Sequence, residues 1–473
     1  MRGLFSRHSP GKWPAKWPAK WPAKWLWGLV AALTVLFSVD RAEAVPAFAR
    51  QTDQPCTSCH IGAFGPQLTP FGIAFKMGGY TLTAGDTPYP YIPISAMAFA
   101  SFNNTANPVE GGSPANDYRA NNNFNLDQIS LFLAGRLSDY AGGMIQITAA
   151  QDGSSVALDD SDLRLTHEFS ISSQDVRIGL DLNDGPTVQD PYNTLYHYAY
   201  PYASSAVSPG PVTAPFAIQA LGGANTIGLT NYWWINQTWY IEGGAYKSLS
   251  PTWFSALGEG SVPSLGEVEG GAPYLRVAYQ KQWGNNFLEV GGVAFYAPMA
   301  ANVIAMPGTN TYLDYGLDAN YQYSNGNHLF AIDTNILQQQ AQLDAMHNAG
   351  LADKSYNEME NFRIAADYYY KNTYGFTMAY NGIWGTSDKT LYAPASVVGS
   401  ANGSPNTQSL TWEADWVPFG KSADTVWDFE KNLKVGLQYT DYLEFNGGTN
   451  NFDGFGHNAS GMNTLYLYVW MAF

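Results

Sequence analysis

The sequence predicts an all-β fold: a 16-stranded transmembrane antiparallel β-barrel with a short N-terminal segment that is expected to plug the lumen. The first observation is composition, since only 13% of the 473 residues are charged, 15% are aromatic and 47 are glycine, whereas soluble domains carry about 25% charged residues. The second is that no apolar run of 18 residues follows the N-terminus, which excludes a helical membrane protein. The third is a series of segments in which apolar and polar residues alternate.

The N-terminus has the features of an export signal. Residues 2–24 are basic, an apolar stretch runs from Trp25 to Val39, and the small-residue site Ala42-Glu43-Ala44 follows. We predict a signal peptide over 1–44, cleaved after Ala44, because the apolar stretch is too short for a stable anchor, the alternative interpretation. Cleavage removes seven basic and two acidic residues, so the formal charge changes from −16 to −21. That charge excludes a nucleic-acid partner and attracts cations.

Both cysteines of the chain lie in Cys56-Thr57-Ser58-Cys59-His60. C-x-x-C-H is the attachment pattern of c-type haem: two thioethers hold the porphyrin edge, and the adjacent histidine becomes the proximal iron ligand. A redox-active cysteine pair would need a βαβ context, which is missing. A zinc site would need further ligands nearby, and no other cysteine or histidine follows before His167. We therefore predict one covalent haem c held by Cys56, Cys59 and His60.

The distal iron ligand is not determined by the motif. Met77 lies 17 positions after His60 and is the first candidate, since a thioether ligand raises the haem potential. The alternative is that Met77 packs on the porphyrin without binding the iron. His197, within the aromatic run Tyr196–Tyr200, is a second candidate. Another ligand or an open position remains possible.

The haem-bearing segment is predicted to span residues 45–90 and the barrel 91–473. A chain of about 45 residues buries little surface and rarely folds alone. A sixteen-stranded barrel, in contrast, encloses a lumen wide enough for water or a plug. We therefore expect the segment to sit inside the barrel, with polar lumen-facing residues as its walls.

Sixteen strands are predicted from the alternating pattern. In 175–182, for example, Leu180 and Leu182 share one face while Arg177 and Asp181 share the other. The predicted strands are 92–103, 123–137, 141–151, 161–170, 174–184, 226–235, 236–247, 273–281, 286–296, 312–323, 327–338, 356–370, 373–385, 406–416, 432–443 and 462–473.

The connections between these strands alternate between short turns and long loops. Turns such as Asn325-Gly326-Asn327 alternate with loops of about ten to forty residues, the pattern of bacterial outer-membrane barrels. The connection near 417–431 is longer than this rule predicts. The last strand ends the chain at Phe473, which is similar to the assembly signal of outer-membrane proteins. The prediction is therefore an exported protein of the outer membrane of a Gram-negative bacterium.

The residues around the haem motif resemble a known family. The run Val45–Thr52, the motif Cys56–His60, and then Pro66, Leu68, Phe71-Gly72, Phe75-Lys76 and Gly79–Leu82 resemble the fused outer-membrane monohaem cytochrome–porins. Their best-known members are Fe(II) oxidases of iron-oxidising bacteria. Two positions depart from the family pattern: Ile73 stands where arginine is usual, and Asp53 where glycine is usual. We expect the missing arginine to change a haem-propionate contact and hence the potential.

The resemblance implies an outer-membrane cytochrome that takes single electrons from extracellular Fe(II). A periplasmic cytochrome c or copper protein would accept them, so the activity would be that of an Fe(II):cytochrome c oxidoreductase. No catalytic residue beyond the haem is implied. The alternative is a porin-like uptake channel in which the haem segment is a structural or redox-gating plug.

Several wall residues are predicted to have structural roles. Asp181, Asp314 and Asp318 are expected to be solvated charges of the lumen wall rather than an iron site. Trp233, Trp234 and Trp384 lie near strand ends and are expected to form interfacial aromatic belts. The tyrosine-rich run 192–202 lies in the longest outer loop, and the sequence leaves open whether it enters the lumen.

Overall fold

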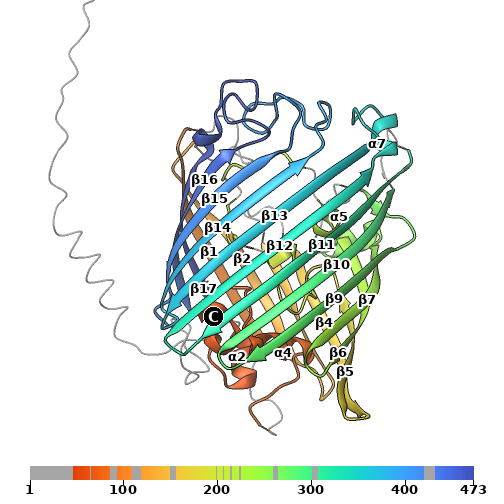
Figure 1. Cartoon of the computed structure of the whole chain (residues 1–473), viewed down its shortest axis with the longest axis vertical. Helices are drawn as coiled ribbons and strands as arrows, with labels where there is room; N and C mark the ends of the chain where they lie inside the picture. The colour runs from red at the N-terminus through yellow and green to blue at the C-terminus, as the bar shows by residue number, and fades with distance from the viewer. Residues whose placement is uncertain are drawn as a thin grey trace, which may run out of the picture. The chain divides into compact units, whose positions relative to one another are not determined.

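A computed structural model describes residues 46–473 apart from 64, 86–92, 109–118, 150–155, 199, 206, 214–215, 223–224, 259–264, 301–306, 420–431 and the side chains of 197, 251 and 254. The predicted signal peptide, 1–44, lies outside this part of the chain. The described residues form a closed antiparallel β-barrel with tilted strands and short helices at both ends (Figure 1).

The barrel consists of long strands of 9–16 residues and one two-residue strand, β8. The strands are β1 (Ile94–Thr105), β2 (Asn123–Arg136), β3 (Ala141–Ala149), β4 (Val156–Ile171), β5 (Gln174–Asn183), β6 (Thr226–Ile235), β7 (Trp239–Ser248), β8 (Glu267–Val268), β9 (Ala272–Trp283), β10 (Asn286–Ala300), β11 (Thr309–Ser324), β12 (His328–Gln342), β13 (Tyr356–Tyr370), β14 (Tyr374–Gly385), β15 (Thr407–Trp416), β16 (Leu433–Glu444) and β17 (Thr464–Ala472).

Strand pairing confirms the predicted fold class. Each long strand pairs antiparallel with its neighbours in sequence, and β1 pairs with both β2 and β17, which closes the sheet. All sixteen predicted strands are present, and β8 adds a short pairing to β10. The largest boundary error is β4, which begins at Val156 rather than at 161. The segment 156–160 reads Val-Ala-Leu-Asp-Asp and does not alternate, and a register shift interrupts its pairing with β3, so the period-two pattern did not mark this start.

The two faces of the wall differ in chemistry. On β5, Leu180 is 46% exposed on the outside while Asp181 is fully buried inside. Trp233 is likewise exposed, but Trp234 is buried in the lumen, because consecutive strand residues face opposite sides. The belt prediction was therefore wrong for Trp234. An apolar outer face around a polar interior is the arrangement of a barrel embedded in lipid.

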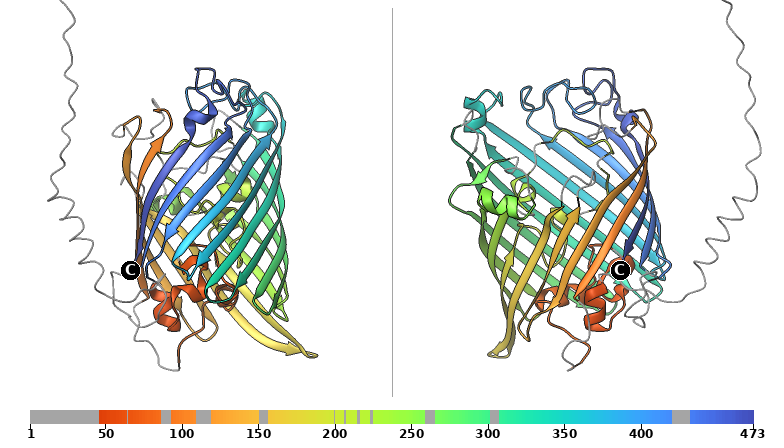
Figure 2. Two further views of the ribbon diagram at one scale, coloured as in Figure 1. Left: turned by 60° about the vertical axis from the view of Figure 1, so that its left-hand side comes forward. Right: turned by 180° about the vertical axis from the view of Figure 1, so that it is seen from behind.

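The N-terminal segment (46–85) lies at the end of the barrel where the short turns and the C-terminus are, as Figures 1 and 2 show. It contains the helices α2 (Pro46–Thr52), α3 (Cys56–Cys59) and α4 (Pro70–Met77) and the 3-10 turn η1 (Ile61–Ala63). Further short helical elements lie in the connections: η2 (Tyr196–Tyr198), α5 (Ala217–Ala220), α6 (Pro251–Ala256), α7 (Asp344–Asn348) and η4 (Ala459–Met462). Within the described ranges, every helix is too short or too polar to cross a membrane.

A second segment, the inward loop (184–225), also occupies the lumen. Its Asp190 pairs with the inward Arg276 of β9, and its Ile218 N–H donates to Asp314 of β11 at 2.7 Å. The prediction that Asp181, Asp314 and Asp318 face the lumen is confirmed, but their predicted solvation is wrong. The inward loop and paired arginines cover them, so all three are at most 3% exposed.

Candidate haem-binding site

The C-x-x-C-H motif forms one helical turn followed by an extended residue. Cys56 and Cys59 lie three residues apart on α3, so their side chains share one face of the turn. The His60 N–H donates to the Cys56 carbonyl at 2.8 Å, and His60 itself is extended, with φ −118°. Both cysteines are thiols rather than a disulfide. The turn therefore offers two sulfur nucleophiles and an adjacent imidazole to a single ligand.

Helix α4 packs directly against this motif. The Thr69 N–H donates to the Cys59 carbonyl at 2.9 Å, and the Thr69 hydroxyl caps α4 by accepting from the Gly72 N–H at 3.2 Å. A Cβ on Gly72 would lie only 2.3 Å from the Cys59 carbonyl oxygen. Glycine at this position is thus required for the close approach of α4 to the cysteine turn.

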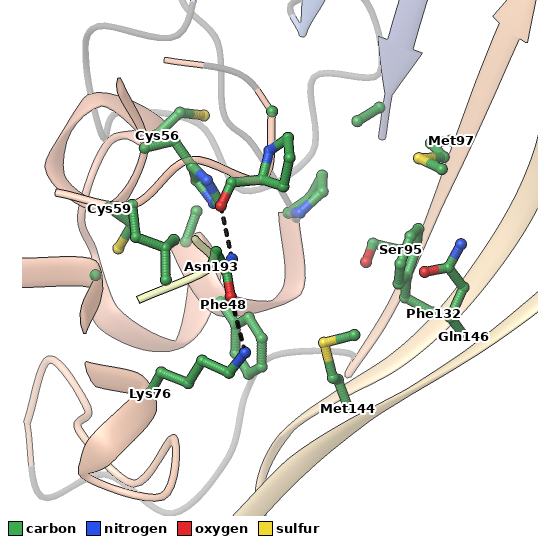
Figure 3. A pocket seen from close by; sticks show the side chains of 18 of the residues that line it. Phe48, Cys56, Cys59, Lys76, Ser95, Met97, Phe132, Met144, Gln146 and Asn193 are labelled. Carbon is green, nitrogen blue, oxygen red and sulfur yellow. Dashed lines mark hydrogen bonds between the residues drawn. The ribbon is translucent and has the colours of Figure 1, made fainter. Parts of the chain in front are cut away.

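A cavity of about 430 Å³ separates the motif from one side of the barrel. Cys56, Cys59 and His60 line one wall, and residues of β1, β2 and β3 line the other (Figure 3). The opposite wall includes Met97, Phe132 and Met144 together with polar groups such as Ser95 and Gln146. Tyr198 and Tyr202 of the inward loop also line the cavity. The volume and the mainly apolar surface are typical of cofactor sites.

The residues at the cavity fit a covalently bound haem. The His60 Nδ1 is buried and has no hydrogen-bond partner among the described residues. Burial lowers the pKa of His60 to about 4, so the imidazole is neutral and keeps a lone pair for a metal. Burial also raises the pKa of Cys59 to about 12, which keeps it a thiol in the apoprotein. Two thiols and a neutral imidazole on one apolar cavity are the groups that haem c requires.

Met77, the predicted distal ligand, does not line this cavity. Its side chain is fully buried in a cluster with Leu68, Ile73, Tyr232 and Trp234, and its carbonyl accepts from the Tyr232 hydroxyl at 2.7 Å. The structure thus gives Met77 a packing role against β6. The side chain of the other candidate, His197, lies outside what the structure describes.

Two cavity residues were not anticipated from the sequence. Met97 and Met144 occupy lumen-facing positions of strands whose other lumen-facing residues are largely polar. An apolar residue at such a position is a break in the polar face. This interruption of the polar pattern is the sequence signal by which Met97 and Met144 could have been identified.

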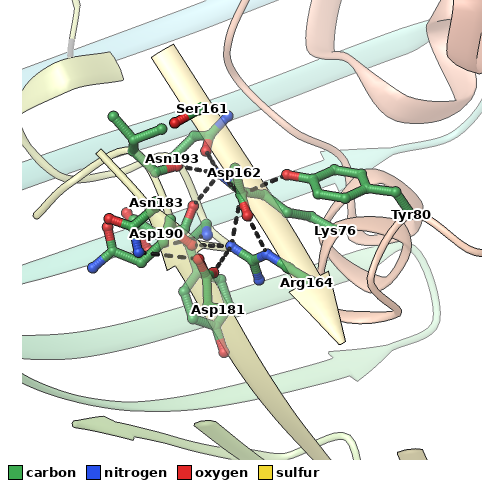
Figure 4. A network of polar contacts seen from close by, with 12 residues as sticks. Lys76, Tyr80, Ser161, Asp162, Arg164, Asp181, Asn183, Asp190 and Asn193 are labelled. Atoms are coloured by element: carbon green, nitrogen blue, oxygen red, sulfur yellow. Dashed lines mark hydrogen bonds and ion pairs between the residues drawn. The ribbon is translucent and has the colours of Figure 1, made fainter. Parts of the chain in front are cut away.

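A buried polar network joins the N-terminal segment to β4, β5 and the inward loop (Figure 4). Arg164 donates to Asp162 through Nε at 2.8 Å and through Nη2 at 2.9 Å, and pairs with Asp181 at 3.0 Å. The Tyr80 hydroxyl donates to the same Asp162 at 2.7 Å. The end of the N-terminal segment is therefore fixed to the barrel through one shared carboxylate.

Lys76 connects the N-terminal segment to the inward loop. Its Nζ donates to the carbonyls of Val188 and Asp190 at 2.8 Å each and to Asn193 Oδ1 at 3.0 Å. Burial lowers the pKa of Lys76 to about 8, although the nearby Asp162 acts in the opposite direction. All three ammonium hydrogens have acceptors on the inward loop.

The two departures from the family pattern have local structural consequences. Asp53 has φ +53°, a left-handed conformation that favours glycine and that aspartate tolerates better than most residues. Ile73 is buried beside Met77 in an apolar cluster and does not line the cavity.

Comparison with known proteins gave no matching family description and no matching curated sequence. Solved barrels are similar at low identity. A loop L8 deletion mutant of OmpT, an outer membrane protein of Vibrio cholerae, is 8% identical over 80% of this chain and 98% of its own, with a TM-score of 0.43. The outer membrane channel DcaP of Acinetobacter baumannii is 12% identical over 80% and 96%, with a TM-score of 0.44. An anion-selective porin from Comamonas acidovorans is 11% identical over 80% and 98%, with a TM-score of 0.43. At these identities and TM-scores, the similarity is no basis for assigning a function.

Proposed function

We propose that this chain is a haem-bearing outer-membrane barrel that takes single electrons from extracellular Fe(II) and passes them to a periplasmic cytochrome c or copper protein. The observation that carries the proposal is the location of Cys56, Cys59 and His60 on one wall of a 430 Å³ cavity inside a closed barrel. An apolar outer face supports membrane insertion. The predicted signal peptide supports export.

The chain's own residues would bind and orient the group. Cys56 and Cys59 would form thioethers, and His60 would be the proximal ligand. Bound there, a haem c would supply a one-electron Fe(III)/Fe(II) couple. Gly72 and Thr69 hold the cysteine turn, while Phe132 and other apolar cavity residues would exclude water from the bound group.

The cavity's position supports the proposed direction of transfer. Its wall includes Ser95, Ala96 and Ala472, which lie at the ends of β1 and β17 on the short-turn side of the barrel. In outer-membrane barrels the short turns face the periplasm. A periplasmic acceptor that docks at this end is therefore close to the cavity, without electron transfer across the full bilayer of about 30 Å.

The test is anaerobic addition of Fe(II) to the purified protein, with the haem absorption spectrum as readout. We expect the ferrous haem spectrum to appear in the wild type, and covalent haem staining to be lost in Cys59→Ala. Ser58→Ala, within the same motif, is the matched control and should keep both signals. A wild-type protein that does not stain for haem, or whose haem stays oxidised with Fe(II), contradicts the proposal.

A channel is the second candidate function. Sixteen long strands enclose a lumen that is wide enough for solutes when it is open. In the described residues, the inward loop donates to the lumen-facing Asp314, and Lys76 of the N-terminal segment donates to that loop. Planar-bilayer recording distinguishes the functions: solute conductance by a protein whose haem Fe(II) does not reduce favours the channel.

A further inference from the structure

We propose that the barrel wall supplies the sixth ligand of the haem iron, as the thioether of Met97 or Met144. The inference rests on the proposed haem site and goes beyond it, because it gives the barrel a direct part in setting the redox chemistry. Both side chains line the same cavity as Cys56, Cys59 and His60. Figure 3 shows them on the wall across from the cysteines.

The positions of the two methionines are set by the strand register. Ser95 of β1 pairs with Phe132 of β2, which pairs with Gln146 of β3. Met97 follows Ser95 by two residues, and Met144 precedes Gln146 by two. Because side chains two residues apart share a face, both methionines face the lumen and flank this row. A flat ligand seated against Phe132 thus has a thioether on either side of the row.

Their chemistry is unusual for this surface. Of the other lumen-facing residues of β1, Ser95, Ser101 and Asn103 are polar and Phe99 is aromatic, and those of β3 include the polar Gln146 and Thr148. A thioether cannot stabilise a water-filled lumen by strong hydrogen bonding, but it is a soft ligand suited to haem iron. Both methionines are half-buried, so their side chains remain accessible from the cavity.

Four other potential ligands on the cavity are engaged in hydrogen bonds or unsuitable. Lys76 donates to three acceptors, and the Tyr80 hydroxyl donates to Asp162. Burial raises the pKa of Tyr198 and of Tyr202 well above the ordinary tyrosine value, so both phenols stay protonated. Among these side chains, the two wall methionines are the neutral soft donors. Thioether ligation raises the haem potential, which suits an acceptor of electrons from Fe(II).

The experiment compares the double variant, in which Met97→Leu and Met144→Leu are combined, with Met77→Leu as the matched control. Leucine conserves volume, so both variants should fold, which heat-dependent gel mobility checks. The readouts are covalent haem staining, the methionine-to-ferric-iron charge-transfer band and the reduction potential. We expect the double variant to stain normally, lose the band and have a lower potential. Met77→Leu should match the wild type, and each single variant should show which methionine binds.

Three outcomes overturn the inference: the band persists in the double variant, it is lost in Met77→Leu, or it is absent from a haem-bearing wild type. These outcomes leave the proposed function standing, since haem staining and reduction by Fe(II) are measured separately. Failure of the proposed function has a different signature, which is a wild-type protein without covalent haem.

Discussion

The two sides of the barrel hold the N-terminal segment in opposite ways. On the packed side, Tyr232 of β6 donates to the Met77 carbonyl at 2.7 Å and Gln322 of β11 donates to the Leu68 carbonyl at 2.8 Å. On the cavity side, the residues of β1, β2 and β3 face the 430 Å³ space instead. The segment contacts this side mainly at its ends, for example where the Arg136 N–H donates to Gln51 Oε1 at 2.8 Å, and the cavity lies beside these contacts.

The difference between the two sides is that the packed side carries most of the buried charged anchors, whereas β1, β2 and β3 carry much of the cavity surface. The packed side carries buried charges that need partners, such as Arg276 with Asp190, Asp318 and Glu289. The cavity residues of β1, β2 and β3 are small, apolar or uncharged and polar, so their substitution leaves no unpaired charge, although Asp159 and Asp160 of β4 also line the cavity. Substitutions on the packed side should therefore cost more stability than substitutions on the cavity side.

The largest effect is expected for Arg276→Ala on the packed side. Arg276 is fully buried, and its Nη1 and Nη2 donate to Asp318 at 2.9 and 2.8 Å. Removing it leaves buried carboxylates uncompensated and releases Asp190 of the inward loop, at a cost of about 3–5 kcal/mol. Urea unfolding in detergent micelles measures this. Lys281→Ala removes an exposed charge from the same strand and is the control. Equal losses of unfolding free energy in the two variants would contradict a stabilising role for the buried charges of the packed side.

A smaller loss is expected where the N-terminal segment meets β13. Gly62 has φ +65°, and a Cβ there would lie 2.2 Å from the Tyr369 ring carbon Cζ. Gly62→Ala should destabilise the protein by about 1–3 kcal/mol, because the ring must move in a packed interior. Gly350→Ala is the matched control, since Gly350 has φ +71° and its added Cβ meets nothing within 4 Å. A Gly62 variant as stable as the Gly350 variant would show that this contact is loose.

The smallest effect is expected for Ser95→Ala on the cavity side. The buried Ser95 Oγ has no hydrogen-bond partner in the described part of the chain. Its removal breaks no bond, so the unfolding free energy should change by less than about 0.5 kcal/mol. The same urea titration tests this expectation. A loss above about 1 kcal/mol would mean that Ser95 on the cavity side also contributes to the stability of the fold.

Particular residues show how far sequence reasoning reaches. The period-two alternation around Leu180 and Asp181 predicted strands and their faces, because a pleated strand exposes successive residues to opposite sides. The spacing of Cys56, Cys59 and His60 predicted a local site, because one helical turn brings them together. Met77 shows the limit: a separation of 17 residues does not determine which side of α4 faces the ligand, and its side chain packs against β6.

The sequence by itself determined the local patterns: the strands, their alternation and the C-x-x-C-H turn. Only the tertiary structure decided that the inward loop enters the lumen, that Asp181 and Asp318 are buried with arginines, and that Met97 and Met144 line the same cavity as the cysteines. Local patterns follow from backbone geometry within a few residues. Contacts across the barrel depend on strand register and on which long connection folds inward, and these are set by packing among residues far apart in the chain.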